Sequence, residues 1–364
     1  MAEDTPAALK DWFDEARYRS IAAQLSTIEP KFRTDVFLPL VLDGLEPRSL
    51  MERLHQCSLA TGAALPGTYR AKLSVLKKLA PLLDHNFVSI FLCDFVSTFG
   101  TDDFDHSLDA LAYFTCFGSG EFAVRPFIIA DQERTFTALH RWAKHENEHV
   151  RRLASEGSRP RLPWGTRLPS LVRDPSPVLP LLEQLKSDPA IYVRRSVANH
   201  LNDITKDHPE RVLDLLSAWD LTQPDHRWIA KQACRTLIKR GHPRALALFG
   251  FGKKPEVTAA LQATPAQLEL GDRLTLTARL KSTSRKAQRL AIDYVIHYVK
   301  ARGVTAEKVF KWTEIDLPPG AILELSRSQQ IRDFTTRKHH PGHHKLELQI
   351  NGHRVTSAAF ELRS

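Results

Sequence analysis

The hydrophobic residues of this chain follow one period up to about Phe251 and another from residue 257 onward. In the first part, apolar residues recur every three or four positions, as in Ile21, Leu25 and Ile28, which is the spacing of one face of an α-helix. In the second part, short segments such as RLTLTARLKS and KLELQING alternate apolar and polar residues, the pattern of a half-buried strand. We therefore expect a helical region followed by a β-sheet domain.

Asn351–Gly352 stands between two alternating runs and predicts a β-hairpin turn, because both residue types accept positive φ. A segment of roughly 100 residues with several such strands suits an immunoglobulin-like β-sandwich. We predict a mostly α protein: a HEAT-like α-solenoid over residues 1–255 and a C-terminal immunoglobulin-like β-sandwich over residues 256–364.

The helical part contains a repeat. When Val150 is aligned with Val193, Arg151–Arg152 falls on Arg194–Arg195, and a looser third copy places Ile229 at the same position. Spacings of 43 and then 36 residues suit a two-helix HEAT-like unit, which buries its apolar stripe by stacking on its neighbours. The predicted stripes are Val150, Leu153 and Ala154, then Val193, Val197 and Leu201, then Ile229, Ala233 and Leu237.

The other face of each repeat helix is polar. Its residues are Arg152, Glu156 and Arg159, then Arg195, Asn199, Asn202 and Asp203, then Lys231, Arg235 and Lys239. We expect these rows to lie side by side and to form a broad, mostly positive surface. A solenoid with such a surface suits an extended polyanion.

Composition favours the same class of partner. The chain has a formal net charge of +9 and 42% hydrophobic residues, so it can form real cores and attract polyanions. Nucleic acid is the first candidate and an anionic membrane surface is the second. No apolar run approaches ~20 residues, and the start, MAEDTPAALKDWFDEAR, is acidic, which argues against a membrane span or a signal peptide. We expect a cytoplasmic protein.

Two histidine motifs raise the question of a metal. HENEH, residues 145–149, matches the HExxH pattern of zinc hydrolases, but the repeat alignment places it across the turn between paired helices, where the two imidazoles would not converge. HHPGHH, residues 339–344, is interpreted as a turn with a chance surface cluster. The four cysteines lack a CxxC pair and are expected to be reduced and buried. We expect neither a metal nor a cofactor.

The segment HVRRLASEGSRPRLPW, residues 149–164, begins as a helix and ends as a stiff arm. Pro160 and Pro163 fix φ and favour extended backbone, so that the arm can hold Trp164 against something. Trp164 is either a buried staple between repeats or a platform for a base or sugar. The arginine pairs could be solvated helix positions, but their recurrence on one predicted face favours contact with phosphates.

The spacing of two carboxylates, Glu121 and Asp203, does not by itself give either of them a catalytic role. Glu121, in GSGEFAVRPF, is expected in the first turn of a helix, where the helix dipole and an i,i+4 pair with Arg125 would explain it. Asp203 is explained equally well as a polar residue near a helix C-terminus.

Three segments resemble signature segments of the AlkC branch of the AlkC/AlkD superfamily, DNA alkylation-repair glycosylases built on HEAT-like repeats: residues 149–164, YVRRSVANHLNDITKDHP and GSGEFAVRPF. The segments LKDWFDEARYRSIAAQL and FTTRKHHPGHHKLELQING are similar to the same branch, including the immunoglobulin-like domain that some members carry. The resemblance spans nearly the whole chain. It implies a monofunctional DNA glycosylase that removes N-alkylated bases, chiefly 3-methyladenine and 3-methylcytosine, from bent duplex DNA without extruding the base into a deep pocket.

The resemblance also implies roles for single residues. An N3-alkylated adenine is cationic and leaves readily, so the enzyme mainly has to stabilise an oxocarbenium-like transition state and guide a water, which a carboxylate near C1′ can do. The implied catalytic carboxylates are Glu121 and Asp203, and the implied lesion contacts are Trp164, Phe122 and Glu156. The predicted DNA contacts are Arg152, Arg159, Arg161, Arg194, Arg195, Lys231 and Arg235. The expected partner is double-stranded DNA with alkylated bases, bound by a monomer that is associated with the nucleoid through this DNA.

Two alternatives stay open. The same basic face would serve a non-catalytic HEAT-repeat scaffold for damaged or branched DNA, and only turnover separates it from a glycosylase. A zinc hydrolase would be separated by metal analysis of the purified protein.

Overall fold

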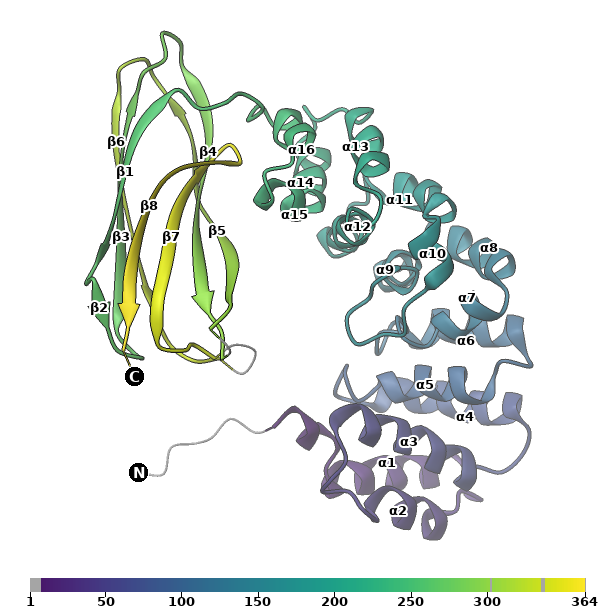
Figure 1. Ribbon diagram of the computed structural model, residues 1–364. Coiled ribbons are helices and arrows are strands. Elements are labelled where there is room, and N and C mark those ends of the chain that lie inside the picture. Colours follow the sequence, from purple (N-terminus) through teal and green to yellow (C-terminus); the bar gives the residue numbers. More distant parts are fainter. Residues whose placement is uncertain (1–7, 302, 335–337, 364) are drawn as a thin grey trace. The chain divides into compact units, whose positions relative to one another are not determined.

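The computed structural model describes residues 8–301, 303–334 and 338–363 (Figure 1). The chain forms two compact units. The first contains the chain up to Asp207 together with Asp220–Ala230, and the second contains His208–Trp219 together with the chain from Lys231 onward.

The regular elements described in the first unit are all helices. Its elements are η1 (Leu9–Phe13), α1 (Glu15–Ile28), α2 (Thr34–Leu42), α3 (Leu50–Ala64), α4 (Tyr69–Leu79), η2 (Ala80–Leu82), α5 (Ile90–Phe99), α6 (Phe104–Phe114), α7 (Arg125–Ala130), α8 (Gln132–Trp142), α9 (Glu148–Gly157), α10 (Pro169–Arg173), η3 (Ser176–Val178), α11 (Leu179–Leu185) and α12 (Ile191–Ile204). Helices close in sequence pack on one another, as α8 does on α9 and α9 on α12. Most of α14 (Pro224–Ala233) also belongs to this unit.

The two segments aligned as repeats form α9 and α12, and their predicted stripes are confirmed. Every member is buried: Val150, Leu153, Ala154, Val193, Val197 and Leu201. Helix α9 begins after Asn147, whose side chain accepts a hydrogen bond from the backbone N–H of His149 (2.8 Å). The third copy differs, because Cys234 interrupts its helix and divides the buried stripe between α14 and α15 (Arg235–Lys239).

The second unit contains α13 (Pro209–Ser217), α15, α16 (Pro243–Leu248) and the strands. The strands are β1 (Val257–Thr264), β2 (Gln267–Leu268), β3 (Arg273–Ser282), β4 (Gln288–Val299), β5 (Thr305–Leu317), β6 (Ile322–Gln330), β7 (Gly342–Ile350) and β8 (His353–Leu362). They form a three-stranded sheet, β1-β3-β6, and a five-stranded sheet, β2-β8-β7-β4-β5. The change of period after Phe251 is therefore confirmed, since α16 ends at Leu248 and β1 begins at Val257.

The sandwich buries alternate side chains, as its sequence predicts. On β3, Leu274, Leu276, Ala278 and Leu280 all face the core between the sheets. The predicted hairpin joins β7 to β8, with φ of 48° at Asn351 and 79° at Gly352. The Asn351 side chain also accepts from the backbone N–H of Ala291 (2.8 Å). The turn therefore ties β4 to the hairpin as well.

Candidate functional site

Six charged side chains of the first unit form one charge network, in which carboxylates and cations alternate. In order they are Glu121, Arg152, Glu156, Arg159, Asp203 and Lys206. Its members come from the turn before α7, from α9 and the residues that follow it, and from the end of α12 with the turn beyond it. The network therefore joins the two repeats that the sequence aligns.

Arg159 is the centre of the charge network. Its Nη1 donates to Oε1 of Glu156 (2.6 Å) and its Nε donates to Oδ2 of Asp203 (2.8 Å). Burial would lower the pKa of Arg159, but these two carboxylates outweigh burial and raise it. Lys206 Nζ then donates to the other oxygen of Asp203 (2.9 Å). Both oxygens of Asp203 therefore accept from cations.

Much of the charge network is buried, which corrects the expectation that these rows face solvent. Asp203 is 3% exposed, and Glu156 and Arg159 are also buried. The helix period assigned them to the polar side of each repeat, but partners from the adjacent segments cover them. A charge that leaves water needs an opposite charge and hydrogen bonds, and each has them here. This part of the face is balanced in charge and not mostly positive.

Glu121 lies in the turn before α7, four residues ahead of Arg125 where that helix begins, and not in the first helical turn in which it was expected. The predicted i,i+4 pair with Arg125 is wrong, since Glu121 accepts from Arg152 and from the hydroxyl of Ser119 (2.8 Å to Oε2). Arg152 also donates to Ser119 Oγ (2.7 Å). With its side chain 16% exposed, Glu121 is the most open of the three carboxylates in the charge network.

A buried polar layer adjoins Glu156 and was not predicted from the sequence. Ser196 donates to Oε2 of Glu156 (2.6 Å), and the Ser155 hydroxyl is 2.9 Å from that of Ser196. His200 Nδ1 lies 2.9 Å from the carbonyl oxygen of Ser155, so this nitrogen carries the proton. Burial, with Arg159 nearby, lowers the pKa of His200 to about 4. The sequence feature that could have indicated this layer is a polar residue next to the buried apolar stripe of α12.

Trp164 is 73% exposed, so the buried-staple alternative is wrong. Its backbone has φ of 63°, in the left-handed region that residues with a side chain seldom adopt. Phe122, next to Glu121, is half-buried. An exposed aromatic ring on a strained backbone requires support from its surroundings, and it is available for contact.

The other predicted DNA contacts of the two aligned repeats differ in whether their side chains already form ion pairs within the protein. Arg161 forms a two-bond ion pair with Asp207 (2.7 and 2.8 Å). Arg194 is 3.1 Å from Asp225 and donates to two backbone carbonyls. Arg195 is exposed and makes no ion pair within the described part of the chain. Arg195 is therefore the most available cation of these three.

In the third copy, two cations of the predicted polar row have partners within the protein. Lys231 is ion-paired with Glu314 of β5 within the second unit, and Glu314 also accepts from Lys311 (2.7 Å). Arg235 donates to the backbone carbonyl of Gln232 (2.7 Å). Lys231 therefore forms an ion pair that stabilises strand β5.

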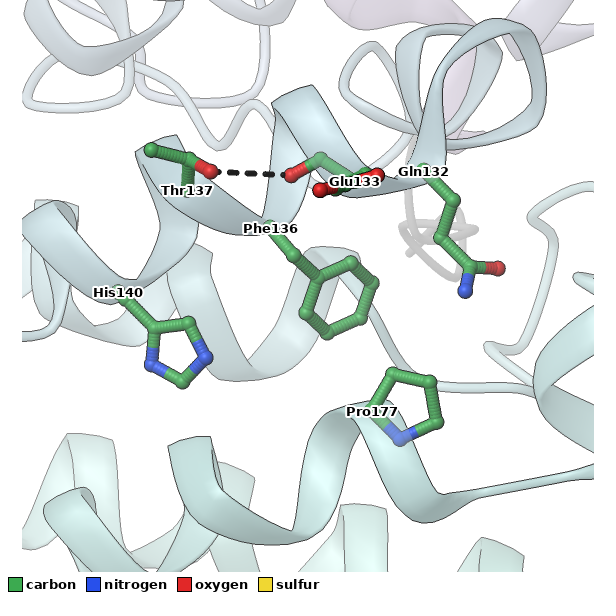
Figure 2. Close-up of a pocket in the computed structure, with 6 residues that line it drawn as sticks. All are labelled: Gln132, Glu133, Phe136, Thr137, His140 and Pro177. Atoms are coloured by element: carbon green, nitrogen blue, oxygen red, sulfur yellow. Dashed lines mark hydrogen bonds between the residues drawn. The ribbon is translucent and has the colours of Figure 1, made fainter.

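The recesses of the first unit include one beside the charge network and one apart from it. One, of about 310 Å³, adjoins the charge network and includes Phe87, Ser119, His149 and Tyr192 in its lining, with the Arg152 guanidinium 5.1 Å from the centre of the Tyr192 ring. The other, of about 460 Å³, is shown in Figure 2 and is lined by Gln132, Glu133, Phe136, Thr137, His140 and Pro177. Among the described residues, no side chain that lines this recess bonds to a member of the charge network, so we assign it no part in the chemistry.

The histidine motifs are accounted for by the fold. His145 lies in the turn before α9 and only His149 is helical, as the repeat alignment predicts. In HHPGHH, His344 is fully buried and stacks on Phe360 (4.9 Å between ring centres), and His339 is almost buried, so the expected surface cluster is wrong for these two. The described residues contain no group of three or more side chains that could hold a metal ion. No described helix is long and apolar enough to cross a membrane.

The chain is similar to known proteins over almost its full length. Residues 257–364 match the family model described as the C-terminal Ig-like domain of the uncharacterised protein YhaZ. The uncharacterized protein YhaZ of Bacillus subtilis is 40% identical over 358 residues, which cover 98% of this chain and 99% of that protein. The alkylpurine DNA glycosylase AlkC of Pseudomonas fluorescens, solved bound to DNA containing an abasic site analog, is 48% identical with a TM-score of 0.97, covering 98% of this chain and all of that one.

Proposed function

Because this chain belongs to the AlkC branch of the AlkC/AlkD superfamily of alkylpurine DNA glycosylases, we propose that it is a monofunctional DNA glycosylase of base excision repair. Its substrates are cationic N-alkylated bases, 3-methyladenine and 3-methylcytosine, in duplex DNA, and its products are the free base and an abasic site. The observation that carries this proposal is the charge network, which gathers three carboxylates, together with the exposed Trp164 five residues after Arg159 in the chain.

Excision of a cationic base requires little of the protein beyond charged groups held at fixed positions. The alkylated base is a good leaving group, so positive charge develops on the sugar at C1′ as the glycosidic bond breaks. Glu121, the most exposed of the three carboxylates, faces this charge and orients the attacking water. The buried carboxylate of Asp203 adds a fixed negative charge that stabilises the transition state. Trp164 and Phe122 pack at the lesion, and Glu156 holds both arginines near it.

Duplex DNA is the proposed partner of a monomer that acts in the cytoplasm, on the nucleoid. Arg195 is ready for a phosphate, since it is exposed and unpaired among the described residues. Arg152, Arg159, Arg161 and Arg194 keep further N–H donors after their ion pairs are counted, because a guanidinium has five. Phosphate contacts by these groups give affinity but no base specificity.

The test is the release of free bases from methylated duplex DNA, identified by mass, with the abasic product counted on the same strand. We expect 3-methyladenine and 3-methylcytosine from the wild-type protein and far slower release of both from Glu121→Gln at equal binding. Tight binding of damaged DNA without any released base would instead favour the non-catalytic scaffold. Release of 3-methyladenine alone would narrow the substrate range and keep the reaction.

A further inference from the structure

Arg125 is a buried arginine that has no part in the chemistry above. It begins α7 and is fully buried. Its Nη1 donates to the backbone carbonyls of Gly157 (2.9 Å) and Arg159 (2.8 Å), and its Nε donates to that of Thr166. These carbonyls stand near the two ends of residues 157–166, here called the Trp164 loop. One guanidinium therefore closes this loop across its base.

The Trp164 loop fits closely around this guanidinium. A Cβ on Gly157 would lie 2.4 Å from Val124, and a Cβ on Gly165 would lie 3.0 Å from Leu162 and 3.4 Å from Arg125 Nε. Leu162 is buried, so the loop also has an apolar anchor. These contacts lie before and after Trp164 in the chain, and its left-handed backbone persists only if its surroundings hold it.

The chemical identity of residue 125 matters because its partners are carbonyl oxygens in different directions. Burial and the nearby Arg159 lower the pKa of Arg125 to about 10, so it remains a cation at neutral pH. An arginine offers a planar fork of donors, whereas a lysine offers one compact ammonium group. A lysine at this place keeps the charge but not the simultaneous grip on both ends of the loop.

We propose that Arg125 is a positioning residue, which fixes the Trp164 loop so that Trp164 and Arg159 meet the damaged nucleotide in one orientation. The part about the nucleotide rests on the proposed function. The part about the loop does not, because it concerns the free protein.

The structural arm of the test uses the whole protein labelled with 5-fluorotryptophan and observed by fluorine NMR, with the Trp164 signal assigned by its loss in Trp164→Phe. The matched control is Arg53→Lys, because Arg53 is also buried and also donates to three backbone carbonyls, those of Lys10, Phe13 and Arg48 (3.1, 3.1 and 3.3 Å). We expect one Trp164 signal in the wild type and in Arg53→Lys. In Arg125→Lys we expect that signal to broaden or split.

The kinetic arm compares the excision rate at saturating enzyme with DNA affinity. We expect Arg125→Lys to lower the single-turnover rate by about tenfold to a hundredfold, the effect of a small misplacement, while the Kd stays within about threefold. Combined with Trp164→Phe, it should cost less than the product of the two single effects, because both act through one loop. Arg53→Lys should excise at the wild-type rate.

An unchanged, sharp Trp164 signal in Arg125→Lys would overturn the proposal, as would an equal loss of excision in Arg53→Lys. If Arg125→Lys does not fold, Gly165→Ala takes its place, since the new methyl group would crowd Leu162 (3.0 Å) in the same loop and touch the Arg125 guanidinium (3.4 Å). If the wild-type protein releases no methylated base, the proposed function fails, and the fluorine spectra alone decide whether Arg125 fixes the loop.

Discussion

Asp203 is held below the surface by two cations, so its replacement affects folding as well as chemistry. In Asp203→Asn, Arg159 keeps Glu156 as its only carboxylate partner in a buried place. We expect the free energy of unfolding to fall by about 3 kcal/mol, the cost of breaking a buried ion pair. Glu121→Gln should change it by under about 1 kcal/mol. Urea unfolding of both variants decides this, and equal losses would contradict the difference in burial.

Glu121 should act mainly on the chemical step. Its charge lies beside the proposed site of an oxocarbenium-like transition state, where one preorganised charge is worth several kcal/mol. We therefore expect Glu121→Gln to excise 3-methyladenine about a hundredfold more slowly in single turnover, with DNA affinity unchanged. A near wild-type rate would move the catalytic role to Glu156, which contacts both arginines of the charge network.

Arg195 and Arg161 test the phosphate contacts from opposite directions. Arg195→Ala should weaken binding to damaged and undamaged DNA alike and make log K against log[salt] shallower by about one unit. Asp207→Asn removes the partner of Arg161 and should strengthen binding of both DNAs. Fluorescence anisotropy titrations at several salt concentrations measure both. A salt slope that Arg195→Ala leaves unchanged would remove Arg195 from the interface.

His200 makes stability depend on pH in a defined direction. Its pKa is about 4 in the folded protein and near 6.5 when unfolded, so the unfolded chain binds the additional proton in between. The stabilisation is complete above pH 6.5 and is lost as the pH falls toward 4. We expect the wild type to lose about 2 kcal/mol more than His200→Gln between pH 7.5 and 5. Parallel pH profiles in urea unfolding would contradict this.

At the scale of helices and strands, the sequence predicted the type of element but not what lies across from it. The stripes of α9 and α12 follow from period alone, because an apolar residue needs cover whichever neighbour provides it. The fate of a polar residue depends on its partner. Arg159 and Asp203 are 44 residues apart, and no local pattern links them. The sequence therefore indicated a solvated face where the structure has a buried network.

The Trp164 loop shows the same limit. Pro160 and Pro163 predicted a stiff arm, and the segment forms a loop of turns after α9. Its closure depends on Arg125, whose contact with Arg159 spans 34 residues. The Asn351 turn was predicted because Asn-Gly has a local conformational preference. Its hydrogen bond to Ala291 was not, because it is set by tertiary structure.

At the scale of the whole chain, the compact units and the proposed boundary at residue 255 make different predictions. A chain shortened to residues 1–255 keeps the charge network but lacks the strands that contact α15 in the second unit. We expect amide exchange to stay slow in α9 and α12 and to become fast in α13, α15 and α16. Hydrogen exchange read by mass spectrometry compares both chains. Equal protection of α15 in the two would make residues 1–255 a folding unit.

Because of the charge network, different residues of the chain attract the DNA and carry out the proposed reaction. Its three carboxylates and three cations cancel, so the excess of nine positive charges on the chain belongs to residues outside it. The long-range attraction of DNA comes from net charge, and dissolved salt ions screen it beyond about a Debye length. The charge network is neutral and partly buried, so it acts only on groups in contact with it and is little affected by those ions. Raising the ionic strength should therefore slow the encounter with DNA yet leave the turnover of an already formed complex untouched.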